Sequence, residues 1–156
     1  MGGDLMRYMI EQDTLKVKEA QFFIANLCEA VAHTHEKGFI HRDIKPENCL
    51  IGNDGYLKLC DYGLAKRLPS AVVLPSSGAT EIVHLAFTMC GTPEFMSPEF
   101  VLSTGYKRSA DWWAVGCILY EMHVGRNPFD QGGDLKRTFK AVCSIGLGRD
   151  TIKIPE

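Results

Sequence analysis

Hydrophobic side chains recur at intervals of three and four residues over residues 17–37, a spacing that predicts a helix. The positions concerned are Ala20, Phe23, Ile24, Leu27, Val31 and Thr34. Gly38 follows, and a glycine at that place commonly ends a helix. A second helix is predicted over residues 109–124, and a third near 134–145. Because the second is apolar almost all the way round (DWWAVGCILYEMHV), we expect it in the middle of the domain.

Two short apolar runs between the first and second helices predict a β-hairpin. Residues 49–51 and 56–60 flank the sequence GNDG, which is a strong turn signal. Such a hairpin brings the residues at its open end, Asn48 and Asp61, to the same rim.

The rest of the chain is punctuated by proline and glycine. Residues 67–87 contain two prolines and no sustained period, which predicts a long, mobile loop. The sequence GTPEFMSPEF (91–100) predicts a turn that leads into a short helix.

Composition indicates an ordinary soluble domain. The chain has 156 residues, of which 46% are apolar and 23% charged. Its net charge of −2 argues against a broad basic face for nucleic acid or anionic lipid. The six cysteines lack zinc-ligand spacing, and we interpret them as reduced thiols. The longest apolar run, 112–120, is too short to span a membrane, and no signal peptide is visible, so we expect a cytoplasmic protein.

The strongest chemical signal is the sequence HRDIKPEN (41–48), followed by DYG (61–63). Phosphoryl transfer requires a base near the attacking hydroxyl, a cation on the transferred phosphate, and oxygen ligands for Mg²⁺. Asp43, Lys45 and Asn48 supply these groups on one short loop, and Asp61 adds a hard carboxylate ligand. The pattern therefore predicts a phosphoryl-transfer site.

These motifs resemble those of the eukaryotic protein kinases, whose pattern is H-R-D-L-x-x-x-N, D-F-G and A-P-E. The third motif is SPE (97–99) here, and the resemblance covers essentially all 156 residues. Each motif departs by one conservative letter, at Ile44, Tyr62 and Ser97. The resemblance implies an α+β, mainly α, fold: the C-terminal (large) lobe of the protein-kinase fold, with a small β-hairpin at the catalytic loop. Residues 1–156 would then be a partial kinase domain, with its activation segment at 61–99.

The resemblance also implies roles for individual residues, with ATP and Mg²⁺ as cofactors. Asp43 would accept the proton of the substrate hydroxyl, and Lys45 would neutralise charge on the γ-phosphate. Asn48 and Asp61 would hold Mg²⁺, and Thr92 would bridge Asp43 and Lys45. The residues implied to bind the nucleotide are Asp4, Leu5, Glu47, Asn48, Leu50 and Asp61. Among them, Asp4 would face the ribose. Leu5 and Leu50, together with Ile51, would form the floor of the nucleotide site.

Two further stretches indicate the kind of kinase. The Lys-Pro pair at 45–46 and GTPE at 91–94 are of the serine/threonine type. FTMCGTPEFMSPE together with DWWAVGCILYEM resembles the basic-residue-directed group that includes the cyclic-nucleotide-dependent kinases. In that group Thr88 would be phosphorylated, with Arg42 and Lys66 as partners of the phosphate.

The same resemblance implies a protein substrate with basic residues near its target serine or threonine, and a regulatory domain or subunit as another partner. Glu47 and Glu121, with Asp4, would face arginines of the substrate. An apolar seat for the residue after the target would be formed by Met89, Pro93 and Met96. Two residues are expected to be structural instead: Asp111 would anchor the HRD loop, and His35 would be a core histidine.

The sequence contains no G-x-G-x-x-G-x-V loop and no strand lysine of the kinase small lobe. We therefore expect a piece of a longer kinase that lacks the small lobe and the last helices. Alone, this piece should be inactive and poorly soluble, and its 111–124 helix should carry an apolar patch. The alternative is a truncated, catalytically inactive kinase-like module that binds a kinase regulator or a substrate. The complete set Asp43, Lys45, Asn48 and Asp61 favours the kinase, because drift would be expected to erode it.

Overall fold

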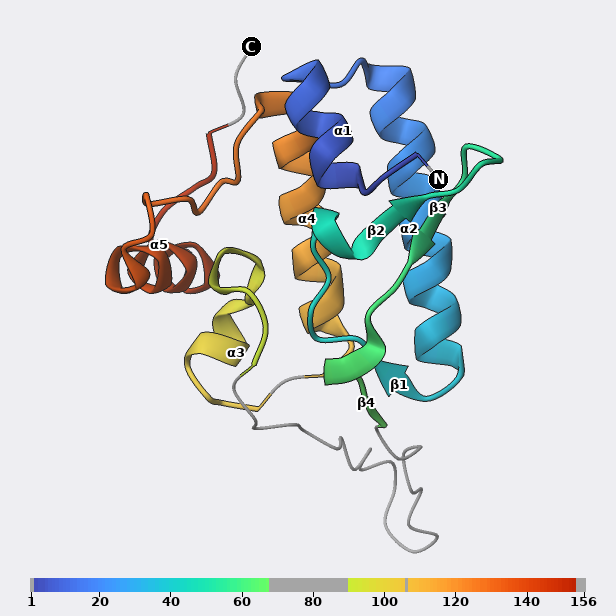
Figure 1. Ribbon diagram of the computed structural model, residues 1–156. Helices are drawn as coiled ribbons and strands as arrows, with labels where there is room; N and C mark the ends of the chain where they lie inside the picture. Colours follow the sequence, from blue (N-terminus) through green and yellow to red (C-terminus); the bar gives the residue numbers. More distant parts are fainter. Residues whose placement is uncertain (1, 68–89, 106, 154–156) are drawn as a thin grey trace, which may run out of the picture.

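The computed structural model describes residues 2–67, 90–105 and 107–153, and these residues form a mainly helical structure with two small sheets (Figure 1). The α-helices are α1 (Leu5–Gln12), α2 (Val17–Glu36), α3 (Pro98–Val101), α4 (Ser109–Val124) and α5 (Leu135–Gly146). The strands are β1 (Phe39–Ile40), β2 (Cys49–Ile51), β3 (Leu57–Leu59) and β4 (Lys66–Arg67). Single turns of 3-10 helix cover Pro46–Asn48 (η1), Tyr62–Leu64 (η2) and Pro93–Phe95 (η3).

Helices α2 and α4 pack against each other and form the centre of the hydrophobic core. Leu27 and Val31 of α2 and Ile118 of α4 are completely buried there. The predicted helices over 17–37, 109–124 and 134–145 correspond to α2, α4 and α5. Periodicity was sufficient to locate α2, which buries a recurrent set of apolar positions, whereas α4 was located by its long apolar run.

Helix α4 is apolar almost all the way round, as expected, but within the described residues only part of its surface is covered. Trp112 and Leu119 are 40% and 37% exposed, and they line an open apolar groove of about 530 Å³ together with Phe129. The expectation of an apolar patch on this helix is confirmed.

The predicted hairpin is confirmed, with β2 and β3 antiparallel and Cys49 opposite Leu59. At its open end, the Cys60 amide donates a hydrogen bond of 2.9 Å to the Asn48 carbonyl. The second sheet pairs β1 with β4, and Ile40 lies opposite Lys66. Arg67, which the sequence assigned to a loop, is therefore in a strand, because that strand finds a partner far away in the sequence. The remainder of that loop lies outside the described residues.

Helix α1 was not expected from the sequence. Asp4 caps its N-terminus, because its Oδ1 accepts a 2.8 Å hydrogen bond from the Arg7 amide. Leu5 and Met9, one helical turn apart, are buried in the core. Asp4 also forms an isolated bridge with Leu50, so this helix lies next to the hairpin.

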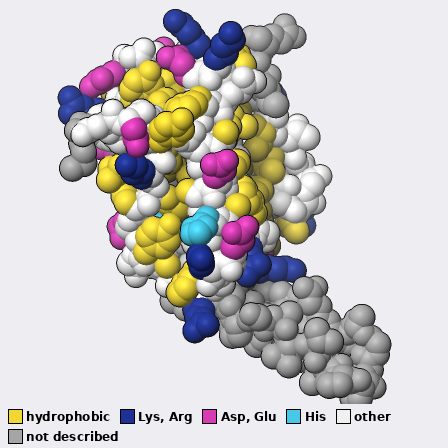
Figure 2. Space-filling model, turned by 90° about the vertical axis from the view of Figure 1, so that its right-hand side faces the viewer, with side chains coloured by type: hydrophobic (Ala, Val, Ile, Leu, Met, Phe, Trp, Pro, Cys, Tyr) yellow, Lys and Arg dark blue, Asp and Glu magenta, His cyan; other side chains and the backbone are white. Residues whose placement is uncertain are grey.

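The outer face of α2, seen in Figure 2, mixes hydrophobic side chains with charged ones. The exposed ring of Phe22 in α2 contacts the ring of Tyr56, with 5.4 Å between their centroids. No helix in the described part of the chain is both long and apolar enough to cross a membrane. All six cysteines belong to the described residues and are free thiols, as expected.

Candidate functional site

The HRD loop, between β1 and η1, is anchored to α4 through the side chain of Asp111. The Asp111 carboxylate, which is 2% exposed, accepts hydrogen bonds from the amides of His41 (2.8 Å) and Arg42 (2.9 Å). Its Oδ2 also lies 2.7 Å from Nε2 of His35, which is itself buried. These contacts fix Arg42 in a left-handed conformation, with φ of 73°, that costs energy outside glycine. The anchoring role expected for Asp111 and the structural role of His35 are both confirmed.

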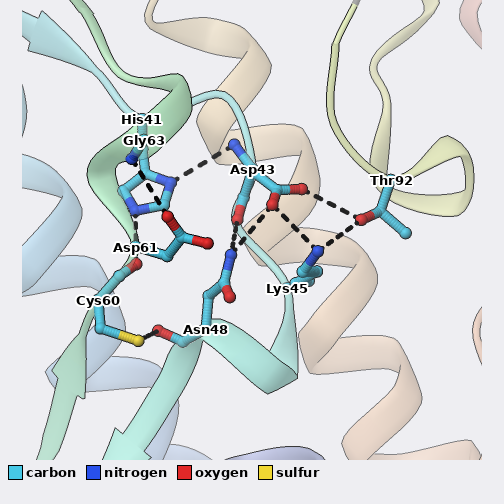
Figure 3. Close-up of polar contacts among 8 residues, drawn as sticks. All are labelled: His41, Asp43, Lys45, Asn48, Cys60, Asp61, Gly63 and Thr92. Atoms are coloured by element: carbon cyan, nitrogen blue, oxygen red, sulfur yellow. Dashed lines mark hydrogen bonds and ion pairs between the residues drawn. The ribbon is translucent and has the colours of Figure 1, made fainter.

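Asp43 lies at the centre of a compact polar cluster (Figure 3). Its Oδ2 is 3.0 Å from Nζ of Lys45 and accepts a 3.1 Å hydrogen bond from Nδ2 of Asn48. Its Oδ1 accepts a 3.1 Å bond from the hydroxyl of Thr92, which in turn accepts from Nζ of Lys45 at 3.0 Å. Nδ2 of Asn48 also donates a 2.8 Å hydrogen bond to the backbone carbonyl of Asp43. The structure thus brings together four residues that the sequence placed in one site.

Thr92 reaches this cluster because Gly91 allows the backbone to approach the HRD loop closely. Gly91 has a φ of 101°, and a Cβ atom built on it would lie 2.7 Å from the Arg42 carbonyl oxygen. A residue with a side chain would therefore be both strained and in collision with backbone at this position.

His41 connects the HRD loop to the segment that carries Asp61. Burial lowers the pKa of its imidazole, so the ring is neutral near pH 7. The Asp43 amide donates to Nδ1 at 3.4 Å, which places the ring proton on Nε2, 3.0 Å from the Cys60 carbonyl. The neutral ring therefore links the two segments through one donor and one acceptor.

Asp61 adopts a left-handed conformation (φ of 58°), and its Oδ1 accepts a 3.2 Å hydrogen bond from the Gly63 amide. The next residue, Tyr62, is anchored twice. Its ring lies edge-on to His41 with centroids 4.7 Å apart, and its hydroxyl is 3.0 Å from the Thr34 hydroxyl on α2. Figure 3 shows the Asp61 carboxylate on the side of the site where Asp43 and Asn48 lie.

The donor atoms of Asn48 and Asp61 are chemically suited to Mg²⁺. Nδ2 of Asn48 donates its hydrogen bonds to Asp43. The side-chain oxygen of Asn48 therefore remains as a hard ligand beside the exposed Asp61 carboxylate. Within the described ranges, no three His, Cys, Asp or Glu side chains form a metal-binding group. That donor set fits an ion that takes its other ligands from phosphate and water, which is how Mg²⁺ is usually bound.

The residues expected around the nucleotide are divided by the structure. Leu50 is half-buried next to Asp4, on the side of the hairpin that faces α1. Leu5 is completely buried in the core, so it does not contribute to an open floor. The resemblance placed Leu5 near the nucleotide but carried no information on which way a helical side chain faces.

Glu47 and Glu121 line a common pocket of about 300 Å³, next to Thr92. Glu94 of η3 and Asp130, which follows α4, also line it, and sequence reasoning missed both. They stand on elements that are distant along the chain, and no spacing rule connects them. Asp4 does not line this pocket in the described structure, and caps α1 instead.

Glu121 is the deeply placed member of this group, with 8% of its surface exposed. Burial, followed by the charge of Glu47, raises the pKa of its carboxyl to about 7, and the neighbouring amide of Asn127 opposes this shift. Within the described residues, its Oε2 has no hydrogen-bond partner.

Other predicted site residues are only partly placed. Thr88 and Met89 lie outside the described residues. Nε of Arg42 donates to the Leu64 carbonyl, and Lys66 lies in β4, so both cations are near the segment that follows Asp61. Pro93 begins η3, beside the pocket. Met96 is 8% exposed and packs with Ile40, Phe100 and Ala110, so it belongs to the core and does not form a surface seat.

Comparison with known proteins gives the family. Residues 1–153 match the family described as Protein kinase domain. The chain is 39% identical to Protein kinase C-like 2 of Schizosaccharomyces pombe, over 98% of this chain and 14% of that protein. It is 37% identical to the cGMP-dependent protein kinase egl-4 of Caenorhabditis briggsae, over 99% of this chain and 19% of that protein. It is 39% identical to the serine/threonine-protein kinase AtPK1/AtPK6 of Arabidopsis thaliana, over 99% of this chain and 29% of that protein.

The chain therefore spans less than a third of the length of each of these relatives. The match to the family extends over the HRD loop, the hairpin, the DYG segment and α4, which are the elements that build the site. The chain belongs to the protein kinase family, among the serine/threonine kinases.

Proposed function

We propose that the polypeptide carrying this chain transfers the γ-phosphoryl group of ATP to serine and threonine residues of proteins. Kinases of this family use ATP with Mg²⁺. The observation that carries the proposal is the Asp43 carboxylate, which is fixed by Lys45, Asn48 and Thr92 at 3.0–3.1 Å. A base held by three donors is preorganised for proton transfer from a substrate hydroxyl.

The residues of the cluster have separate tasks in this proposal. Asp43 accepts the proton of the attacking hydroxyl, while Thr92 and Asn48 hold its carboxylate in place. Lys45, whose side chain is 22% exposed, presents its ammonium group to the phosphate and offsets the charge that develops there. The oxygen atoms of Asn48 and Asp61 would hold Mg²⁺. Bound Mg-ATP supplies the transferable phosphoryl group and charge neutralisation.

The acidic pocket beside this cluster supports a preference for substrates with basic residues near the target. Glu47, Glu94, Glu121 and Asp130 converge there from three parts of the fold. Carboxylates pair with guanidinium groups through strong, charge-assisted hydrogen bonds. We also propose that the chain forms the large lobe of a kinase that works in the cytoplasm. The six free thiols agree with a reducing compartment.

The test is a phosphoryl-transfer assay on the polypeptide in its full encoded length, with ATP, Mg²⁺ and an Arg-Arg-x-Ser peptide. We expect transfer, and a loss of roughly 10²–10⁴-fold in kcat when Asp43 is changed to Asn. Glu36→Gln is the matched control, because the side chain of Glu36 is 76% exposed at the end of α2, and it should retain full activity.

A folded polypeptide of full length that transfers no phosphate would contradict the proposal. If it still bound the peptide, the result would favour a kinase-like module that binds a substrate without catalysis. Binding of an ATP analogue with Mn²⁺ gives an independent readout. NMR signals near Asn48 and Asp61 should broaden, and they should not broaden in an Asp61→Asn variant.

A further inference from the structure

The acidic pocket contains one carboxyl group with an oxygen atom that the described residues leave unpaired. The pocket has a volume of about 300 Å³, and Glu121 lines its wall with only 8% of its surface exposed. Within the described residues, Oε2 of Glu121 accepts no hydrogen bond. A buried polar atom without a partner costs free energy, so its presence in a wall of a pocket indicates a group that pairs with a ligand.

The surroundings of Glu121 are strongly negative. The charged groups that face the pocket come from every element around it: Glu47 of η1, Glu94 of η3, and Arg126 and Asp130 of the segment after α4. Helix α1 contributes an uncharged residue, Met6. The thiol of Cys117, one turn earlier on α4, stays neutral because burial raises its pKa to about 12. Arg126 can offset only one of the four carboxylates.

We infer that Glu121 is protonated while the pocket is empty and releases its proton to solvent when a basic side chain enters. This inference rests on the proposed preference for basic substrates and adds a regulation to the same site. An incoming guanidinium donates to the unpaired oxygen and replaces the missing positive charge, which removes the reason for the group to remain neutral. Recognition of a basic substrate is then coupled to pH.

The size of the effect follows from the pKa of Glu121. With a value of about 7 in the empty pocket, the group is mainly protonated at pH 6 and mainly ionised at pH 8. If only the ionised form binds the guanidinium, the apparent affinity should be about tenfold weaker at pH 6 than at pH 8.

Isothermal titration calorimetry in two buffers of different ionisation enthalpy measures this coupling directly. The probe is an Arg-Arg-x-Ser peptide, titrated into the full-length polypeptide. Proton release should approach one proton per peptide at pH 6 and fall towards zero at pH 8. In Glu121→Gln the pH-dependent release should disappear and affinity at pH 8 should fall. In Asp130→Asn the release curve should move to lower pH, because one neighbouring negative charge is lost.

The outcomes separate this inference from the proposed function. Tight peptide binding that is independent of pH, with no proton release, would overturn the coupling and leave the substrate preference intact. Absence of binding at every pH, including pH 8, would overturn the substrate preference and the coupling together. Glu36→Gln, on the exposed end of α2, should reproduce the wild-type proton release. Thermal unfolding of each variant shows that it is folded, and the Asp130 variant tests the coupling while the Glu121 side chain is left in place.

Discussion

Asp43 and Glu121 are both buried acidic side chains near the same surface, yet the fold treats them in opposite ways. Asp43 is 9% exposed, and each of its carboxylate oxygens has a donor at 3.0–3.1 Å. Glu121 is 8% exposed, and its Oε2 has no partner among the described residues. Equal burial therefore corresponds to a complete hydrogen-bond network in one case and an incomplete one in the other.

We interpret the difference as one of role: the Asp43 carboxylate has to be fixed in position, whereas the Glu121 carboxyl group pairs with a ligand. A base in phosphoryl transfer has to be positioned before the substrate arrives, and fixed donors achieve this. A recognition group, in contrast, gains specificity if its partner is the substrate itself, because a ligand without the matching charge leaves it unpaired. The four predictions that follow test the comparison, beginning with the largest expected effect on stability.

Asp111→Ala should cost about 3–5 kcal/mol of unfolding free energy, measured by chemical denaturation. Asp111 is the third buried carboxylate among the described residues, and its loss leaves two backbone amides of the HRD loop and His35 without their acceptor. The exposed Asp150 is the matched control, and its change to Ala should cost less than about 0.5 kcal/mol. Equal effects of the two changes would show that the HRD loop is not held through Asp111.

Glu121→Gln should increase the free energy of unfolding, in contrast to Asp111→Ala, but only at high pH. The pKa of the carboxyl rises from its ordinary 4.5 to about 7 on folding, so the folded state holds the proton more tightly. Wild-type stability should therefore fall as pH rises from 4.5 to 7 and remain lower above that. At pH 8 the variant should be more stable than wild type by roughly 2–3 kcal/mol, with little difference at pH 4.5. Denaturation curves at both pH values measure this, and equal effects at both would contradict it.

Thr92→Val should cost about 1–2 kcal/mol, because Oδ1 of the buried Asp43 loses its donor. Thr14, which is exposed, serves for comparison, and its change to Val should be close to neutral. A neutral result at Thr92 would mean that the Asp43 cluster does not depend on the segment after Gly91.

Tyr62→Phe should give the smallest effect, about 0.5–1 kcal/mol. It keeps the ring against His41 and removes only the hydroxyl contact with Thr34. Tyr56→Phe removes a hydroxyl from a ring that is 55% exposed and should change nothing measurable. If the two variants have the same melting temperature, the Thr34 contact does not stabilise the DYG segment.

Much of the fold could be predicted from the sequence, because its long helices have clear hydrophobic patterns: a period in α2 and a continuous apolar run in α4. Helices α2 and α4 each bury a recurrent apolar set, and the GNDG turn sets the register of the hairpin. Helix α1 was missed because it has only eight residues, and its buried Leu5 and Met9 provide a single repeat of the pattern. Strand β4 was missed because a two-residue strand is defined by its partner rather than by its own composition.

The candidate site shows the same limit. Asp43, Lys45 and Asn48 could be grouped because they share one loop, and motif resemblance added Thr92 and Asp61. Glu94 and Asp130 could not be found in this way, since only the folded chain brings them to Glu121. Side-chain burial could not be predicted from the motifs either. Leu5 and Met96 were assigned to open surfaces, and both lie in the core.

The most direct test of the proposed separation is steady-state kinetics of two variants in the same assay, on the full-length polypeptide at pH 8. Asp43→Asn should lower kcat by roughly 10²–10⁴-fold for any peptide. Glu121→Gln should raise KM for an Arg-Arg-x-Ser peptide while kcat changes little, because it removes a contact that is present in ground state and transition state alike. A fall in kcat of similar size in both variants, or no change in KM for Glu121→Gln, would contradict the account.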